Sequence, residues 1–230
     1  MKKPYIKKFS EIADFTFWIV DGNYIRSNFN GEFTNYGNHY MFKFIPKKEF
    51  WIDKERKEGE EKYYINSMLI IHKLMSKKVK YDEALKRADI IEKKERAKSK
   101  IIRKEMKLTK NHDKLIKSVH KKLLKKYSKK VKVWIVNGEI VRGLFFVDFT
   151  EGGHDKVYHF IPKKEVWIDN DIEPKEIKFI ILHELHERAL MSKGMKYNSA
   201  HLSSNKIEYY CRKHPSELNN KLKKEIQKNK

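Results

Sequence analysis

The chain contains the same unit twice, and this internal repeat limits the possible folds more than any other feature of the sequence. The segment WIVDG at 18–22 returns as WIVNG at 134–138, and the same spacing pairs residues without a gap as far as Glu92 and Glu208. Roughly thirty of the paired positions are identical, far more than chance would give. A chain of 230 residues therefore divides into two domains, each long enough to bury a core.

Each repeat begins with patterns typical of β-strands. Apolar and aromatic residues at 15–20 and 131–136 predict a strand. The Asp-Gly or Asn-Gly pair that follows favours a tight hairpin, with the next strand starting at Tyr24 or Ile140. Two more strands are expected in each repeat, at 40–45 and 49–52 in the first and at 157–161 and 165–168 in the second.

Each repeat ends with patterns typical of helices. In the second repeat, apolar residues follow the helical period from 176 to 193, and a second helix can begin at Asn198 or Ser199 and end at Lys213. We therefore predict an α+β fold with two tandem units, each a small antiparallel β-sheet followed by a helical hairpin. The predicted segments are a first repeat at 9–98, a basic and largely helical connector at 99–124, a second repeat at 125–214 and a basic C-terminal tail at 215–230.

The net charge of +22 favours a polyanionic partner such as nucleic acid. The excess of lysine lies mainly in the connector and at the C-terminal end. Lysine greatly outnumbers arginine, which supplies the bidentate contacts of sequence-specific recognition, so nonspecific binding is the expectation. A lysine-rich genome would produce the same excess without any such function.

The sequence predicts a soluble, intracellular protein, located in the cytoplasm or in a virion. Cys211 is the only cysteine, which excludes a disulfide within the chain and fits a reducing compartment. The N-terminal residues are basic, as in a signal peptide, but Glu11 and Asp14 interrupt any apolar core after them. No apolar run reaches the length of a membrane span. The sequence does not indicate an oligomeric state.

The repeats differ most at the positions where catalytic chemistry is expected. SMLII at 67–71 in the first repeat becomes HELHE at 183–187 in the second. On a helix, His183 and Glu187 are four residues apart and share one face, which is the spacing that brings two side chains to one ion. Glu184 lies next to His183, where a carboxylate reaches a metal-bound water instead of the metal. Apolar residues surround these positions, and a bound metal would satisfy polar groups that are costly to bury.

This pattern resembles the His-Glu-x-x-His signature of the zincin metallopeptidases, with Glu187 in place of the second histidine. The resemblance covers one helix of the second repeat. It implies a zinc ion held by His183 and Glu187, with Glu184 as the general base. Because one ligand is a carboxylate, iron and manganese are alternative metals.

A third ligand must come from another segment, and His201 on the second helix is the first choice. The first repeat has Leu85 at this position, so His201 belongs to the residues that distinguish the two copies. Glu208 lies on the same helix face, but about 10 Å further along the axis, too far for the same ion. Its match in the first repeat is Glu92, so a structural or ligand-orienting role is expected for it, such as pairing with Arg212.

Two other histidines are alternative ligands or supporting residues. His186 could replace Glu187 as a ligand, although it points to another side of the helix. His154 follows two glycines in a segment that is ordinarily a turn, from which it would reach the site. Without a metal, the polar groups of the helix would instead form a buried ionic network with Arg188 and Arg212.

Together these patterns predict a metal-dependent hydrolase that attacks a carbonyl group, with a peptide or protein as the expected substrate and a non-catalytic first repeat. The alternative is a basic nucleic-acid-binding or scaffold component of a nucleoprotein particle or virion, in which any metal is structural. Three protein ligands and an open position would indicate an enzyme, and four protein ligands a structural site.

Overall fold

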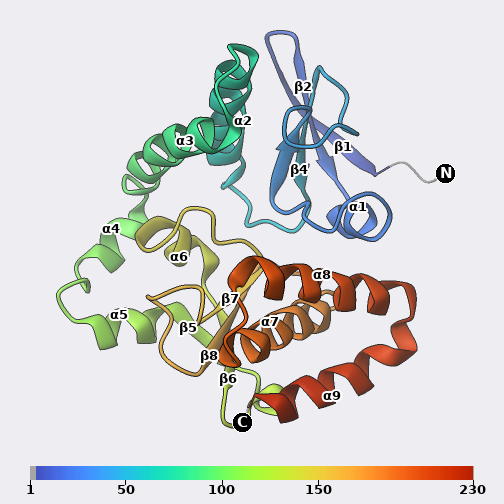
Figure 1. Cartoon of the computed structure of the whole chain (residues 1–230). Coiled ribbons are helices and arrows are strands. Elements are labelled where there is room, and N and C mark those ends of the chain that lie inside the picture. Colours follow the sequence, from blue (N-terminus) through green and yellow to red (C-terminus); the bar gives the residue numbers. More distant parts are fainter. Residues whose placement is uncertain (1–3, 230) are drawn as a thin grey trace. The chain divides into compact units, whose positions relative to one another are not determined.

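A computed structural model of the chain describes residues 4–229 (Figure 1). The chain forms two compact units, one of residues 1–106 with 142–148 and one of residues 107–141 with 149–230. Each unit contains a four-stranded sheet followed in the chain by helices. The predicted α+β class and the organisation in two units are therefore confirmed. None of the helices within residues 4–229 has the length and apolarity needed to cross a membrane.

The first unit has the strand order β1-β2-β4-β3 and a helical hairpin. Its strands are β1 (Tyr5–Ile12), β2 (Phe15–Val20), β3 (Tyr36–Asn38) and β4 (Glu49–Asp53). Its helices are α1 (Gly22–Asn28), which follows β2, then α2 (Glu61–Ser76) and α3 (Tyr81–Arg96), which form the hairpin, and α4 (Lys100–Met106).

The second unit repeats this order as β5-β6-β8-β7 and adds a further helix. Its strands are β5 (His120–Leu123), β6 (Lys132–Val136), β7 (Gly152–His154) and β8 (Glu165–Asp169). Its helices are α5 (His112–Val119), α7 (Ile177–Ser192), α8 (Tyr197–Lys213) and α9 (Leu218–Lys228), with short 3₁₀ turns η1 (Lys125–Tyr127) and η2 (Pro215–Glu217). Helix α6 (Gly138–Leu144) follows β6. Helices α7 and α8 agree closely with the two helices predicted for the second repeat.

The central pair of strands in each sheet is parallel. Trp18 of β2 lies opposite Trp51 of β4, and Trp134 of β6 lies opposite Trp167 of β8. The outer strands pair antiparallel with these. The sheets are therefore mixed, and the prediction of an entirely antiparallel sheet is wrong for the central pair. A parallel pair needs a crossover connection, which α1 and β3 supply in the first unit and α6 and β7 in the second.

The Asp-Gly and Asn-Gly pairs start helices, so the hairpins predicted there are wrong. The carboxylate of Asp21 accepts a hydrogen bond from the backbone N–H of Tyr24 at 3.2 Å and caps α1, and Asn137 caps α6 in the same way. The side chain of Asp53 lies so close to the backbone at position 22 that only glycine fits, because a Cβ there would lie 1.7 Å from an oxygen of Asp53. The strand predicted after each pair is therefore a helix.

Turns replace the strands predicted at 40–45 and 157–161. The side-chain oxygen of Asn38 accepts a hydrogen bond from the backbone N–H of Tyr40 at 2.9 Å, which turns the chain at the end of β3. In the second unit, the backbone oxygen of His154 accepts from Val157 at 3.1 Å and turns the chain at the end of β7. Strands β3 and β7 therefore lie just before the apolar segments 40–45 and 157–161, where the sequence predicted strands.

The basic connector between the repeats is helical only in part. Helices α4 and α5 lie within it, but His120–Leu123 forms the strand β5 and pairs with β6. The ring of His120 stacks on Trp134 with centroids 4.2 Å apart, and its Nε2 lies 2.9 Å from Glu165 Oε2. These contacts join the end of the predicted connector to the second sheet.

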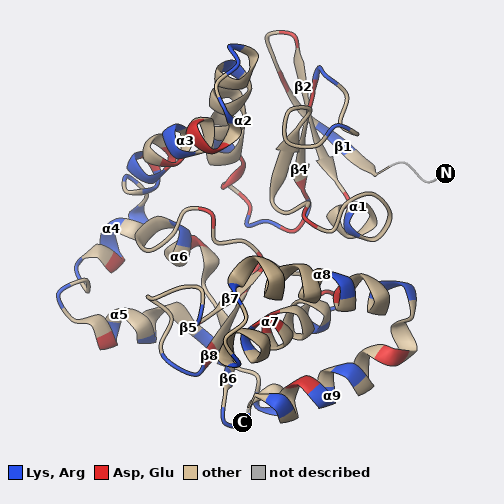
Figure 2. Ribbon diagram, in the orientation of Figure 1, with Lys and Arg blue, Asp and Glu red and all other residues tan. Residues whose placement is uncertain are grey.

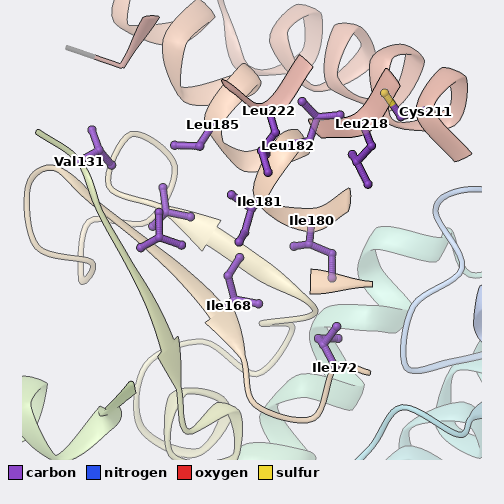
Figure 3. Packing of buried hydrophobic residues seen from close by; sticks show 12 residues of the cluster. Val131, Ile168, Ile172, Ile180, Ile181, Leu182, Leu185, Cys211, Leu218 and Leu222 are labelled. Atoms are coloured by element: carbon purple, nitrogen blue, oxygen red, sulfur yellow. The ribbon is translucent and has the colours of Figure 1, made fainter. Parts of the chain in front are cut away.

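The basic C-terminal segment packs onto the second unit as α9 and is not a free tail. Leu218 and Leu222, one helical turn apart, are 6 % and 3 % exposed and join the core formed by α7 and the sheet. Figure 3 shows this core, with Ile181 of α7 facing Ile168 of β8. Burial of each leucine contributes about 1.5–3 kcal/mol. The many lysines of the segment obscured this apolar stripe in the sequence.

Two carboxyl groups of the first unit share a hydrogen bond, Asp89 on α3 and Asp148. Burial, followed by the charge of neighbouring carboxylates, raises the pKa of Asp89 to about 7 and that of Asp148 to about 6. Both groups therefore bind protons more tightly in the folded chain than in the unfolded chain. Their contribution to stability is complete below about pH 4 and is lost as the pH rises to about 7.

The variant Asp89→Asn/Asp148→Asn is therefore expected to gain thermal stability relative to the unmodified protein as the pH rises from about 5 to about 7.5. Thermal unfolding followed by circular dichroism at several pH values measures this difference. Asp82→Asn, at an exposed position of α3, is the control and should show no such gain. A difference that does not change with pH would contradict the assignment.

Candidate metal centre

The second unit brings together His183, Glu187 and His201, the three residues predicted from the sequence as metal ligands. These three residues are called the ligand group below. His201 Nδ1 lies 3.3 Å from His183 Nε2 and 2.8 Å from Glu187 Oε2, and the latter two atoms are 3.6 Å apart. Two ligand atoms on one tetrahedral zinc ion, at its usual bond lengths, lie about 3.3 Å apart. The three atoms therefore have the spacing of one face of a zinc coordination tetrahedron.

Helix spacing and helix packing set this arrangement. His183 and Glu187 are one turn apart on α7, and His201 lies on α8, which packs against α7. His183 and Glu187 are buried, whereas the side chain of His201 is 28 % exposed. The group therefore has a buried side and a side that solvent can reach.

Glu208 orients His183. Its Oε2 lies 2.9 Å from His183 Nδ1, and its other oxygen accepts from Arg212 at 2.9 Å. Arg212 in turn donates to Glu176 at 2.7 Å. When Nδ1–H donates to Glu208, the lone pair of Nε2 points into the ligand group. The predicted supporting role of Glu208 and its pairing with Arg212 agree with this geometry.

The first unit contains the same supporting chain without the candidate metal ligands. Ser67 donates a hydrogen bond to Glu92, and Arg96 pairs with both Glu92 and Glu60. Ser67 stands at the position that His183 occupies in the second repeat. The Glu-Arg-Glu chain is therefore part of the fold of both units, and the candidate ligands His183, Glu187 and His201 belong to the second unit.

His154, at the end of β7, orients Glu187. Its Nδ1 accepts a hydrogen bond from the backbone N–H of Lys156 at 3.1 Å, so the neutral ring carries its proton on Nε2. That nitrogen lies 3.0 Å from Glu187 Oε1 and donates to it, which leaves Oε2 facing the two ligand histidines. His154 is fully buried, and this geometry fits the supporting role that the sequence predicted as one of its two possible roles. The first repeat has Asn38 at this position, so a comparison of the two copies at this position could have indicated a role for His154.

Glu184 lies beside the ligand group, next to β7. One of its carboxylate oxygens lies within 4.8 Å of ligand atoms of His154 and Glu187, so these three residues form a second, overlapping group. The proton on His154 Nε2 argues against metal binding there. A Cβ added to Gly152 would lie 3.3 Å from Glu184 Cγ, so the backbone of β7 passes close to this side chain. Burial raises the pKa of Glu184 to about 8 in the metal-free site.

Hydrogen bonds within the group set its charges. Burial alone would raise the pKa of Glu187, but hydrogen bonds from His154, His183 and His201 hold it well below its ordinary value. Burial alone would lower the pKa of His183, but its hydrogen bonds to Glu187 and Glu208 hold it well above its ordinary value. The group therefore attracts positive charge, which a proton on an imidazole or a divalent cation can supply.

Two side chains considered from the sequence do not belong to the ligand group. His186 places Nε2 3.0 Å from Ser203 Oγ and Nδ1 3.0 Å from Glu225 Oε1, so it faces away from the site and does not serve as the alternative ligand. Arg188 pairs with Asp155 at 2.6 Å. It therefore takes no part in the ionic network that was the alternative to a metal.

The residues present fit a zinc ion in chemistry as well as in spacing. Two imidazole nitrogens and one carboxylate oxygen are a donor set that zinc takes in hydrolases. The chain has no significant match among protein-family models, curated proteins or solved structures.

Glu208→Gln is expected to weaken metal binding by about 10–100-fold, because the amide is a poorer acceptor for the Nδ1–H of His183. Glu92→Gln, at the matched position of the first unit, is the control and should leave metal affinity unchanged. Competition with a chromophoric zinc chelator measures both. Equal losses in the two variants would mean that the effect comes from lost stability and not from orientation of the ligand.

Proposed function

We propose that the second unit is a metal-dependent hydrolase in which His183, Glu187 and His201 hold a zinc ion. The observation that carries this proposal is the spacing of the three ligand atoms, between 2.8 and 3.6 Å. Three protein ligands would leave a tetrahedral ion one position for water or substrate, as in catalytic zinc sites. The partial exposure of His201 supports access to that position.

Each side chain of the site has a role in this reaction. A zinc ion held by these residues would act as a Lewis acid and would lower the pKa of a bound water molecule to about 7. Glu184 accepts the proton of the attacking water and passes it to the leaving group. Glu208 holds the ring of His183, and His154 holds the carboxylate of Glu187, so the ligands need little rearrangement during the reaction.

A peptide or protein is the proposed substrate class. The pattern of His183, Glu184 and Glu187 on α7 resembles the signature of the zincin metallopeptidases, and this resemblance supports a peptide bond as the target.

The first unit is proposed to be non-catalytic, because Ser67, Ile71 and Leu85 stand at the positions of the three ligands. The alternative function, a nucleic-acid-binding or scaffold protein with a structural metal, calls for four protein ligands. Within residues 4–229, His183, Glu187 and His201 form a group of three, and the overlapping group with His154 and Glu184 shares only Glu187 with it. This number favours catalysis over a structural role.

Elemental analysis of the purified protein tests for the metal, and digestion of a peptide library before and after chelation tests for hydrolysis. We expect stoichiometric zinc, and hydrolysis that a chelator removes and added zinc restores. Stoichiometric iron or manganese would identify one of the alternative metals. A protein without stoichiometric metal would contradict the proposal, and metal without hydrolysis would favour the structural alternative.

A further inference from the structure

A cavity of about 370 Å³ lies in the second unit, and none of the residues of the metal centre lines it. Its walls come from three segments: the turn η1 and the residues after it, the first turn of α7, and one face of α9. Small-molecule sites in proteins typically have volumes of about 300–1,000 Å³. The cavity is therefore large enough for a ligand of moderate size.

Lysines surround this cavity. Lys126 comes from η1, Lys129 from the residues after it, Lys178 from α7 and Lys223 from α9, and no acidic residue lines the cavity. Lys178 donates a hydrogen bond to Asn219 at 3.3 Å, whereas the other three lysines form no ion pair within residues 4–229. Figure 2 shows the basic positions along α9. Positive charge that is not balanced by the protein favours an anionic ligand.

The floor of the cavity is apolar and carries amide groups. Leu222 is 3 % exposed, and the side chains of Tyr127 and Ile226 beside it are half-buried. Asn219 and Gln227 each offer an amide that both donates and accepts hydrogen bonds. A planar ring could pack on the tyrosine and the aliphatic side chains with its polar edge towards the amides. A long acyl chain would need a longer apolar wall than these three side chains form.

We propose that this cavity binds a nucleoside phosphate, either free or as one unit of a single-stranded nucleic acid. The lysines bind the phosphate, and the apolar floor with Tyr127 holds the base. The site belongs to the second unit only, because the connection between β1 and β2 in the first unit consists of Ala13 and Asp14 and carries no lysine. The proposal does not depend on the hydrolase activity.

Binding of three probes to the full-length protein at physiological ionic strength tests this proposal. The probes are adenosine monophosphate, a fluorescein-labelled oligothymidylate and, as an anion without a base, tripolyphosphate. Lys126→Gln/Lys223→Gln removes two lysines of the cavity, and Lys122→Gln/Lys224→Gln removes the same charge at exposed positions outside it. Tyr127→Leu removes the aromatic ring and keeps an apolar side chain.

We expect the cavity double variant to lose affinity for the nucleotide probes by about tenfold or more, and the control double variant by less than about threefold. Tyr127→Leu should weaken adenosine monophosphate binding and leave tripolyphosphate binding unchanged. Binding of the mononucleotide would identify a free nucleotide as sufficient, and binding of the oligonucleotide alone would identify a single strand. Equal losses in the two double variants, equal binding of adenosine monophosphate by the unmodified protein and Tyr127→Leu, or no binding of either nucleotide probe would overturn the proposal.

Discussion

Glu184→Gln is expected to lower hydrolysis by about 10²–10⁴-fold while the protein keeps its metal. The amide has nearly the shape of the carboxylate but cannot accept the proton of the attacking water. Digestion of the peptide library and elemental analysis, carried out on the same preparations, measure the two effects together. Glu83→Gln, at an exposed position of α3, makes the same chemical change outside the site and should alter neither.

Two other results with Glu184→Gln would change the proposed role of this residue. Undiminished hydrolysis would remove Glu184 from the mechanism. Loss of the metal would instead assign its carboxylate to the overlapping ligand group with His154 and Glu187. That result would also require a different tautomer of His154, since its Nε2 carries the proton in the arrangement described above.

His183→Ala is expected to weaken metal binding by at least about 100-fold, because it removes a ligand and not only a group that orients one. Elemental analysis after dialysis, together with chelator competition, measures the loss. Ser67→Ala provides the matched control, since it changes the same position of the first repeat. Full metal content in the His183→Ala variant would show that this histidine is not a ligand.

The same pair of variants allows a test that needs no substrate. A metal that binds only the folded chain raises its stability by mass action. A chelator should therefore lower the midpoint of thermal unfolding in the unmodified protein and in Ser67→Ala, and leave that of His183→Ala unchanged. A similar decrease in all three proteins would mean that the chelator acts at another site.

The repeat allowed much of the candidate site to be predicted from the sequence. The spacing of His183 and Glu187 places them on one helix face, since local helix geometry depends only on their separation along the chain. Comparison of the two copies added His201, which the first repeat lacks, and assigned Glu208 to the group of supporting residues because Glu92 matches it. The catalytic role of the site stays a prediction.

The fold was less predictable where a single pattern allows two local structures. Asp-Gly and Asn-Gly suit both a hairpin and the start of a helix, and the choice depends on the approach of Asp53 to Gly22. In the same way, lysines dominate the sequence of α9, and its burial becomes evident only when Leu218 and Leu222 meet α7.

The sequence by itself determined that the protein has two related α+β units, and that His183, Glu184, Glu187 and His201 distinguish the second unit from the first. The tertiary structure decided how those groups meet. It placed His154 against Glu187 and turned His186 towards Ser203, and it set the central strands parallel. The repeat and the helix spacing depend only on the order of residues along the chain, so the sequence shows them. These contacts join segments that are distant in the chain and meet only when the chain packs.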